Sequence, residues 1–423
     1  MRKLPPSERI GKEISELLGQ GCQGQEDLLS VLIKKSVKKV IQEILEAEVK
    51  DYLGRDYYQR QGGKARGYRN GYENRNLKMS EGKIGLEVPQ LRDTQSSFNS
   101  AFLDEVGLLS PQLERLALEM YVRGLSTRDV EESFKDKEGK LLLSKSAVSE
   151  ITDSLAEEYE RFASRDLSNF DVVYLFLDGV YESLRKEAGF KEAILCGWAI
   201  LSTGQKVMLH LALGNKESYE SWRDFLRNMI SRGLRVPLFV NSDGAPGLIR
   251  AIQECLPESR RGRCIVHKLR NIAVKLPEAA VPEVMPKVKN VYYQTDREVA
   301  MLCATRLVEE YASVYPAAIK CFQEDLEACL AHLEFPAGHH KHIRSTNLLE
   351  RVFEEEKRRT KVIPRFLNER SCLKLVFGIL IRASEKWHRV KMSSYNLALL
   401  KNIRALHGWK DEADGFISKK QAA

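Results

Sequence analysis

The stretch Val172-Val-Tyr-Leu-Phe-Leu-Asp178-Gly179-Val180 decides the fold of this chain. Six apolar or aromatic residues stand in a row before a carboxylate and a glycine. A short apolar run that is rich in β-branched and aromatic residues, and that ends at a turn signal, predicts a buried strand. We therefore expect Asp178 at the end of a central strand, where the strand meets solvent.

A second stretch, Pro237-Leu-Phe-Val-Asn-Ser-Asp243-Gly244, repeats this pattern. Neighbouring strands of a sheet lie about 5 Å apart, so carboxylates at two such strand ends can share a metal ion. Mg²⁺ is typically bound by one or two carboxylates together with substrate phosphates. Asp-Gly is also a common turn, and either aspartate alone is equally consistent with a turn. The two together favour a metal site.

The chain around these two stretches alternates between predicted strands and helices. Strands are expected at residues 172–178, 192–201, 206–213, 237–242 and 263–266, and helices at residues 218–232 and 246–255. Short connections make the first three strands an antiparallel meander, whereas helical connections make the others parallel. In that layout the first and fourth strands are neighbours. The expected fold class is α/β, with a ribonuclease H-like mixed five-stranded sheet.

The region before the sheet is predicted to be mainly helical, with one basic segment. Apolar residues recur at helical spacing from Asp27 to Leu53, and Gly54 supplies a stop signal. Residues 55–78 then hold seven Lys or Arg against two acids, interleaved with tyrosines and glycines. Arginines on a flexible backbone, here Arg66 and Arg69, suit contact with DNA phosphates or the minor groove. The alternative is an inert basic loop.

Residues 110–155 have the pattern of three consecutive helices. They begin near Pro111, Ser126 and Ser144, and Gly124 ends the first of them. This is the outline of a helix-turn-helix, in which Lys145 would open the recognition helix. Units of three helices also occur without any DNA role. A strand is expected at residues 82–89, ahead of these helices.

The part that follows the sheet breaks the strand and helix alternation. Residues 277–342 contain several helical stretches and no strong strand, which indicates a helical insertion. A helix over residues 345–359 then places Glu350 in its first two turns. Its end is strongly basic, with Lys357, Arg358, Arg359 and Lys361. Such a helix could set a metal ligand beside a phosphate-binding strip.

Composition favours a polyanionic partner and a reducing compartment. The net charge is +8, and the basic residues cluster. Eight cysteines form no Cys-x-x-Cys pair, so neither a zinc ribbon nor a disulfide framework is indicated. No signal peptide or membrane-spanning stretch is visible, so we expect a cytoplasmic protein with no membrane partner.

Four motifs together resemble one family. They are Phe-Leu-Asp178-Gly-Val-Tyr, Asn-Ser-Asp243-Gly-Ala-Pro-Gly-Leu, Arg263-Cys264-Ile-Val-His267-Lys268-Leu-Arg-Asn271, and Ser345-Thr-Asn-Leu-Leu-Glu350-Arg with the basic run after it. The chain is similar to bacterial mutator-type DDE transposases, an insertion-sequence family, over about residues 30–390. Family members carry a triad of two aspartates and one glutamate.

The resemblance implies the following organisation. Residues 1–25 are a disordered N-terminus, 26–165 a DNA-binding and dimerisation region, 166–275 the first part of the catalytic core, 276–342 the helical insertion, 343–410 the second part of the core with the Glu-bearing helix, and 411–423 a tail.

The resemblance also implies a mechanism and partners. Asp178, Asp243 and Glu350 would be the catalytic residues and the ligands of two Mg²⁺ or Mn²⁺ ions, with Asp178 bridging them. Arg263 and Lys268 would contact DNA, while Cys264 and His267 would be structural or of uncertain role. The expected partners are double-stranded DNA, as terminal inverted repeats and as target, and a second copy of the chain in a homodimer, in the cytoplasm of a bacterium.

Two other functions fit the same residues. A ribonuclease H-like nuclease without strand transfer would have the same active site. A catalytically silent DNA-binding regulator would need no triad, and the presence of all three acids argues against it.

Overall fold

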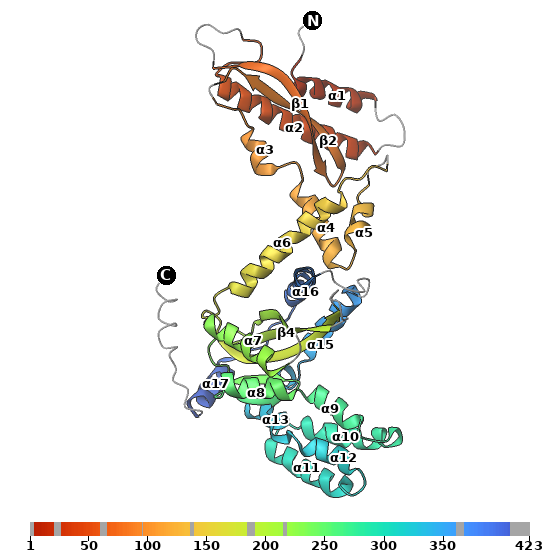
Figure 1. The fold of residues 1–423 in the computed structure, drawn as a ribbon, viewed down its shortest axis with the longest axis vertical. Helices are drawn as coiled ribbons and strands as arrows, with labels where there is room; N and C mark the ends of the chain where they lie inside the picture. Colours follow the sequence, from red (N-terminus) through yellow and green to blue (C-terminus); the bar gives the residue numbers. More distant parts are fainter. Residues whose placement is uncertain are drawn as a thin grey trace. The chain divides into compact units, whose positions relative to one another are not determined.

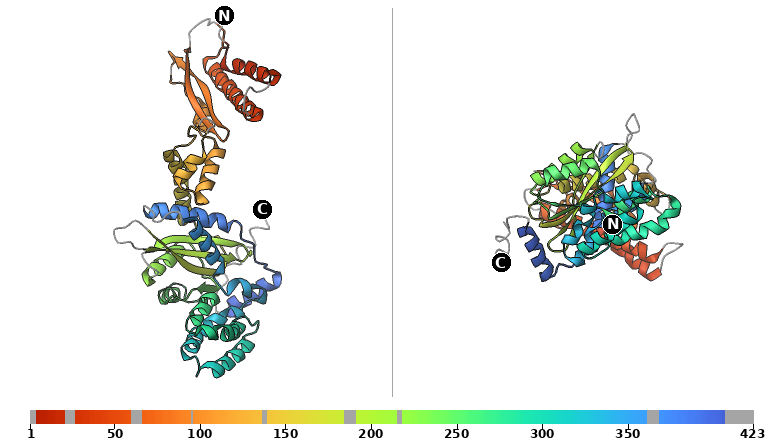
Figure 2. Two further views of the ribbon diagram at one scale, coloured as in Figure 1. Left: turned by 90° about the vertical axis from the view of Figure 1, so that its right-hand side faces the viewer. Right: turned by 90° about the horizontal axis from the view of Figure 1, so that it is seen from below.

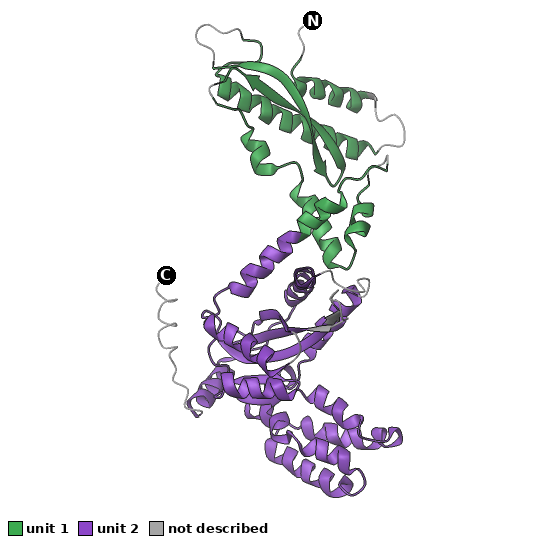
Figure 3. Cartoon of the chain, in the orientation of Figure 1, with its two compact units in different colours: residues 1–152 green, residues 153–423 purple. Residues whose placement is uncertain are grey.

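The computed structural model describes residues 4–20, 27–59, 66–94, 96–135, 139–183, 191–214, 218–360 and 368–406. The chain divides into two compact units, residues 1–152 and residues 153–423, which are coloured separately in Figure 3. Within the described ranges, no helix has both the length and the apolar character that crossing a bilayer requires.

Unit 1 consists of helices and one two-stranded antiparallel sheet (Figure 1). Its elements are α1 (Pro6–Gln20), α2 (Leu28–Leu53), β1 (Tyr68–Met79), β2 (Gly82–Arg92), α3 (Ala101–Val106), α4 (Pro111–Val122) and α5 (Thr127–Ser133), and α6 (Lys145–Ser164) runs from unit 1 into unit 2.

Helix α2 organises the first part of unit 1. The Asp27 carboxylate caps its first turn, and Gly54 ends it in the left-handed conformation, as the sequence predicts. Its Ile41 and Leu45 form a core with apolar side chains of β2. The buried Gln42 amide donates to the Glu87 carbonyl and accepts from the Glu87 N–H, so the helix also satisfies backbone groups of β2.

Two parts of unit 1 differ from the prediction. Residues 1–25 were expected to be disordered, but α1 spans Pro6–Gln20, with Ile10 buried and Ser7 hydrogen-bonded to Glu46 of α2. Residues 55–78 were expected to be flexible, but β1 occupies Tyr68–Met79 and pairs with β2. Contacts with α2 stabilise α1, whereas β1 is stabilised by pairing with β2, which follows it directly, and by the packing of Leu77 in the core that α2 and β2 share.

The three predicted helices of residues 110–155 are present as α4, α5 and α6. Ser110 and Ser126 cap the first two, and Ser126 forms a capping box with Asp129. Residues 134–144 connect α5 to α6, and Lys135 forms an isolated bridge with Leu141. This connection is longer than the turn of three or four residues in a helix-turn-helix.

Unit 2 is built on a five-stranded sheet in the order β5-β4-β3-β6-β7. The strands are β3 (Val172–Ser183), β4 (Lys191–Leu201), β5 (Lys206–Gly214), β6 (Phe239–Ser242) and β7 (Arg260–Arg263). The first three pair antiparallel, and β6 and β7 continue the sheet in parallel with β3. This confirms the predicted mixed sheet, in which the first and fourth strands are neighbours.

Two helices of unit 2 connect its last three strands, and the others follow β7. They are α7 (Tyr219–Ser231), α8 (Pro246–Cys255), α9 (Ile265–Ala273), α10 (Val281–Tyr292), α11 (Arg297–Tyr311), α12 (Pro316–Gln323), α13 (Leu326–Leu330), α14 (His340–Ile343), α15 (Asn347–Thr360), α16 (Glu369–Ser384) and α17 (Ser394–Leu406), with 3₁₀ turns at Glu278–Ala280, Ala331–Glu334 and Ala337–His339.

The position of the fifth strand corrects the prediction. A strand was expected at residues 263–266, but β7 ends at Arg263 and Ile265 begins α9. The apolar Ile265 packs into the core of the following helices rather than into the sheet. The edge strand is the polar sequence Arg-Arg-Gly-Arg, which a search for apolar runs does not find.

The sheet and the helices that follow it have separate hydrophobic cores. One face of the sheet packs on α7 and α8 through residues such as Leu177, Trp222 and Leu248. On the other face Phe176 stacks on Trp198, with ring centroids 4.0 Å apart. Helices α9 to α13 have a core of their own, and Figure 1 and the left view of Figure 2 show them gathered on one side of the sheet.

Candidate active site

The register of β3 and β6 brings Asp178 and Asp243 together. The last paired residues of these parallel strands are Leu177 and Ser242, and the two aspartates are the next residue on each strand. Asp178 is not at the end of its own strand, as the sequence analysis expected, because β3 continues to Ser183. The element that ends beside Asp178 is the neighbouring strand β6, whose last residue is Ser242.

The Asp178 carboxylate is buried and only partly satisfied. The residue is 5% exposed, and its Oδ1 accepts a hydrogen bond from the Gly179 N–H at 2.9 Å. Its Oδ2 is buried and has no hydrogen-bond partner among the described residues. Burial raises the pKa of Asp178 to about 7; the nearby His267 opposes this rise and the nearby Asp243 adds to it.

Asp243 is half-buried, and a turn fixes its orientation. Its Oδ1 accepts a hydrogen bond from the Ala245 N–H at 2.9 Å, just before α8 begins. Gly244 follows with φ of 82°, a conformation that favours glycine. The Arg263 guanidinium occupies the space where a side chain at Gly244 would stand. The Asp243-Gly244 pair thus forms a turn and also orients the Asp243 carboxylate.

Glu350 lies in the first turn of α15 and is held by two residues of α9. Its Oε1 lies 3.3 Å from the His267 Nε2, and Arg270 donates to both carboxylate oxygens at 3.3 and 3.0 Å. The Glu350 side chain is 15% exposed. His267 also lies close enough to Asp178 to oppose the rise of its pKa, so this imidazole is a neighbour of both acids.

The start of α15 is attached to α9 and β6. The Cys264 Sγ accepts hydrogen bonds from the Thr346 N–H at 3.3 Å and from the Thr346 hydroxyl at 3.4 Å. The Ile265 N–H donates to the Arg344 carbonyl at 3.0 Å, and the Asn241 amide donates to the Ile343 carbonyl. These bonds bring the helix that bears Glu350 to the strand end that bears Asp243.

The residues present fit a divalent cation that prefers oxygen ligands. The unpartnered Oδ2 of Asp178 and the adjacent Asp243 are hard oxygen donors, which suit Mg²⁺ or Mn²⁺. Ligand atoms of Cys264, His267 and Glu350 also lie within 4.8 Å of one another. Three such ligands are one short of a structural zinc site, and Cys264 already accepts two hydrogen bonds.

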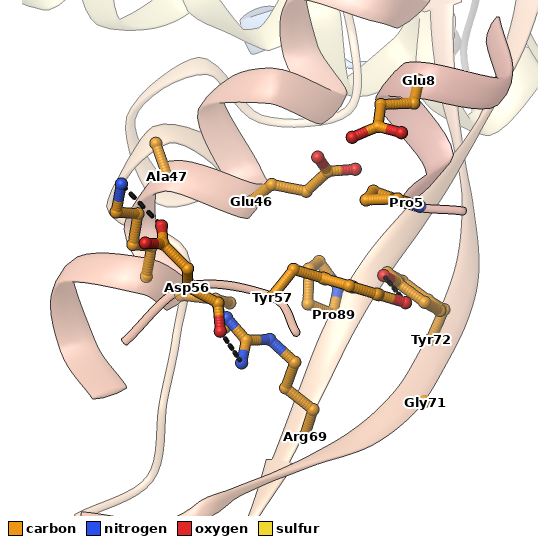
Figure 4. Close-up of a pocket in the computed structure, with 12 residues that line it drawn as sticks. Pro5, Glu8, Glu46, Ala47, Asp56, Tyr57, Arg69, Gly71, Tyr72 and Pro89 are labelled. Carbon is orange, nitrogen blue, oxygen red and sulfur yellow. Dashed lines mark hydrogen bonds and ion pairs between the residues drawn. The ribbon is translucent and has the colours of Figure 1, made fainter. Parts of the chain in front are cut away.

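The predicted DNA contacts in unit 1 have different environments. Arg66 and Lys145 are exposed. Arg69 is partly buried and donates to the carbonyls of Arg55 and Asp56 at 3.2 and 3.4 Å. Figure 4 shows Arg69 beside Tyr57 in the wall of a cavity of about 450 Å³. Its guanidinium therefore stabilises the turn after α2 in this conformation.

The predicted DNA contacts in unit 2 also divide into exposed and buried groups. Lys357 and Arg358 are exposed at the end of α15, where Arg358 and Arg359 form ion pairs with Glu355. Lys361 lies outside the described residues. Arg263 and Lys268 are 5% and 3% exposed. These two are buried in the protein and are not part of its outer surface.

Sequence reasoning missed Arg270 and Thr346. Arg270 is one helical turn after His267, so their shared helix face could have been found from the spacing. Thr346 belongs to the motif Ser345-Thr-Asn just before α15, which the sequence analysis quoted without assigning it a contact. Its bond to Cys264 joins residues 82 positions apart, which no local pattern reveals.

Comparison with known proteins places the chain in a family. Residues 14–390 match the family model described as "Transposase, Mutator family". The chain is 34% identical over 357 residues to the transposase for insertion sequence element ISRM5 of Rhizobium meliloti (strain 1021), a match that covers 84% of this chain and 88% of that protein.

Two further relatives cover similar shares. The transposase for insertion sequence element IS406 of Burkholderia multivorans is 30% identical over 88% of this chain and 93% of its own length. The transposase for IS256 in transposon Tn4001 of Staphylococcus aureus is 28% identical over 86% of this chain and 94% of its own length. From the extent of these matches, the chain belongs to the mutator family of transposases.

Proposed function

We propose that this transposase acts by metal-dependent cleavage and joining of DNA at the site of Asp178, Asp243 and Glu350. The supporting observation is the register that sets Asp178 beside Asp243, with Glu350 presented from the facing helix by Cys264 and His267. We also propose that the mixed sheet is a ribonuclease H-like core, and that α10 to α14 are an insertion within it.

The protein's part in the reaction is to hold ligands and orient DNA. Divalent cations at this site would stabilise charge at the phosphorus and lower the pKa of the attacking water. Asp178 and Asp243 hold their oxygens toward the end of β6, and the bonds to Gly179 and Ala245 fix them. To bind the same metal ions as the two aspartates, Glu350 has to give up at least part of its contact with Arg270. No protein nucleophile is required.

The proposed reaction has two displacements at phosphorus. Water first attacks at the end of the element, and the phosphodiester yields a 3′-hydroxyl and a 5′-phosphate. That 3′-hydroxyl then attacks a phosphodiester of target DNA and releases the target's own 3′-oxygen. The first step alone would describe a nuclease, and the second distinguishes a transposase from it.

The partners follow from the same proposal. Double-stranded DNA would be bound at the terminal inverted repeats by unit 1, and as target by unit 2. Two ends have to be held together for joining, so a homodimer is the simplest active form. We place this activity in the bacterial cytoplasm, on nucleoid DNA.

A strand-transfer assay tests the proposal. A labelled duplex is made from the DNA that flanks the reading frame, so that it ends at the terminus of the element. This duplex is mixed with a supercoiled plasmid, the protein and Mg²⁺. We expect labelled, relaxed plasmid. Asp178→Asn should reduce this product by a thousandfold or more, since the metal's contribution of several kcal/mol is about that large.

Binding of the same duplex in a mobility-shift assay is the control for folding. Asp178→Asn should bind the duplex as the wild type does. Cleavage without joining would identify a nuclease and overturn the strand-transfer part of the proposal. Binding without any cleavage by the wild type would identify a DNA-binding regulator.

A further inference from the structure

A largely buried cluster of three basic side chains and one carboxylate lies where β7 and α9 meet α13, and of its members Arg263 also packs on Gly244 in the site described above. Its members are Arg261, Arg263, Lys268 and Asp325. Arg261 and Arg263 are two residues apart on β7, so their side chains leave the same face of the strand. Helix α13 packs against β7, and Asp325 stands immediately before that helix.

Contacts and electrostatics place the cluster around Asp325. Arg261 donates to Asp325 at 2.8 Å. Burial raises the pKa of Asp325, but the Arg261 hydrogen bond and the charges of Arg261, Lys268 and Arg263 together hold it below its ordinary value. Lys268 and Arg263 also oppose the rise that burial causes in the pKa of the neighbouring Cys329. All three cations therefore lie near one carboxylate.

The charges of the cluster do not balance. Three cations face one carboxylate, so two positive charges are left over. Asp243 precedes the Gly244 on which Arg263 packs, but it forms no ion pair with Arg263. A buried charge without a partner is costly, since desolvation is not offset by attraction. The imbalance indicates an anion.

The hydrogen-bond donors of the cluster are also unsatisfied. Arg263, which is 5% exposed, has its Nε and Nη1 buried without a partner among the described residues, and Arg261 has its Nη1 in the same state. Lys268 is 3% exposed, and its charge acts on both Asp325 and Cys329. The unpartnered donors of Arg263 lie against Gly244, and the cluster reaches the surface at Arg261 and Asp325, whose side chains are 23% and 27% exposed.

We propose that the cluster of Arg261, Arg263 and Lys268 binds a phosphate group, which compensates the positive charge that Asp325 leaves. The planar donors of arginine match phosphate oxygens, and lysine adds a point charge. The phosphate comes from a phosphodiester of bound DNA or from the free anion. The DNA source rests on the proposed function, whereas the anion site does not.

Thermal unfolding in inorganic phosphate tests the anion site directly. Millimolar phosphate, at constant ionic strength against chloride and without divalent metal, should raise the Tm of the wild-type protein by about 2–4 °C. Lys268→Met removes one charge at similar volume and should abolish most of that rise. Asp325→Asn removes the competing carboxylate and should increase it.

An exposed lysine provides the matched control. Lys275→Gln changes the net charge equally, near the end of α9 but away from the cluster, and should respond to phosphate as the wild type does. In phosphate-free buffer Lys268→Met should be at least as stable as the wild type, because it removes an uncompensated buried charge. Equal responses of wild type, Lys268→Met and Lys275→Gln would overturn the proposal.

Salt dependence of duplex binding distinguishes the two sources of phosphate. If the ligand is a DNA phosphodiester, Lys268→Met should reduce the slope of log K against log salt by about 0.9. An unchanged slope together with a lost phosphate response supports a site for the free anion. Failure of the wild type to cleave DNA would count against the proposed function and leave the thermal result standing.

Discussion

Asp178 is the residue whose environment is most clearly built for a ligand. Its carboxylate is buried beside a second carboxylate, and one of its oxygens has no partner among the described residues. Such a group is destabilising in its charged form until a cation or a proton joins it. Protonation and the proposed metal binding would therefore be alternatives at the same atoms.

The raised pKa of Asp178 gives a pH dependence with a definite sign. Below about pH 4 the carboxyl is protonated in both folded and unfolded chains. As pH rises from there to about 7, only the unfolded chain ionises readily, so the folded protein loses stability. Without divalent metal, the free energy of unfolding should fall by on the order of 1.4 kcal/mol for each pH unit within that range.

Asp178→Asn removes this titration and supplies the check. Urea unfolding in EDTA at pH 5 and at pH 8 should show a smaller loss of stability for the variant than for the wild type. Mg²⁺ should restore the wild type at pH 8 and should have little effect on the variant. If the wild type and the variant lose the same free energy of unfolding between pH 5 and pH 8, the assigned environment of Asp178 is wrong.

Gly262 provides a second prediction at this scale, from packing alone. A methyl group added there would stand 2.1 Å from the Phe239 ring, so Gly262→Ala forces the ring or the edge strand to move. Overpacking of this kind costs about 1–3 kcal/mol. Gly338→Ala is the matched control, because nothing lies within 4 Å of the added carbon. Equal urea midpoints for the two variants would contradict the packing of β7 on β6.

At the scale of elements, α9 connects the two halves of the active site. Its first residues bond the start of α15 through Thr346, and its His267 and Arg270 hold Glu350. In the proposed metal site, Arg270 and a divalent cation would compete for the same carboxylate. Metal binding would then have to overcome the contact with Arg270.

Arg270→Gln should accordingly bind metal more tightly. The Arg270 side chain is 59% exposed, and an exposed ion pair is worth up to about 1 kcal/mol, so the gain in Mn²⁺ affinity should stay below about tenfold. Titration calorimetry on wild type, Arg270→Gln and the exposed Lys275→Gln measures it. A weaker affinity in Arg270→Gln would show that the guanidinium supports the metal site instead.

The sequence predicted elements with a strong apolar pattern and missed those held by tertiary contacts. Strands β3 to β6 and helix α2 have continuous or periodic apolar residues, and all were expected. Strand β1 is polar and was not expected, although its partner β2 begins only three residues after it. Helix α1 and the edge strand β7 are also polar, and each is stabilised by a partner further away in sequence. No local pattern encodes such a partner.

The candidate site likewise contains residues that the sequence predicted and contacts that it did not. The three acids could be identified from two strand motifs and one helix start. The bonds from Thr346 to Cys264 and from Arg270 to Glu350 join segments about 80 residues apart, and only the folded chain brings them together. Burial of Arg263 and Lys268 could not be inferred either, since basic residues are usually exposed.

At the scale of the whole molecule, the division into units predicts a division of labour. The described parts of the active site all belong to unit 2. A fragment of residues 145–423 keeps α6 intact and should retain its fold by circular dichroism and its affinity for Mn²⁺. It should lose preference for the terminal repeat over unrelated duplexes, measured by competition in a mobility shift. Retained preference would place sequence recognition in unit 2.

Cleavage by glutamate variants of α15 tests the central claim most directly, since Glu350 is the acid that comes from furthest away in sequence. The substrate is a labelled duplex that spans one end of the element, with Mg²⁺ present. Glu350→Gln should lose a thousandfold or more of the cleavage rate while binding the duplex normally. Glu354→Gln, one turn further on and exposed, should cleave as the wild type does. Cleavage by Glu350→Gln at the wild-type rate would contradict a catalytic site of three acids.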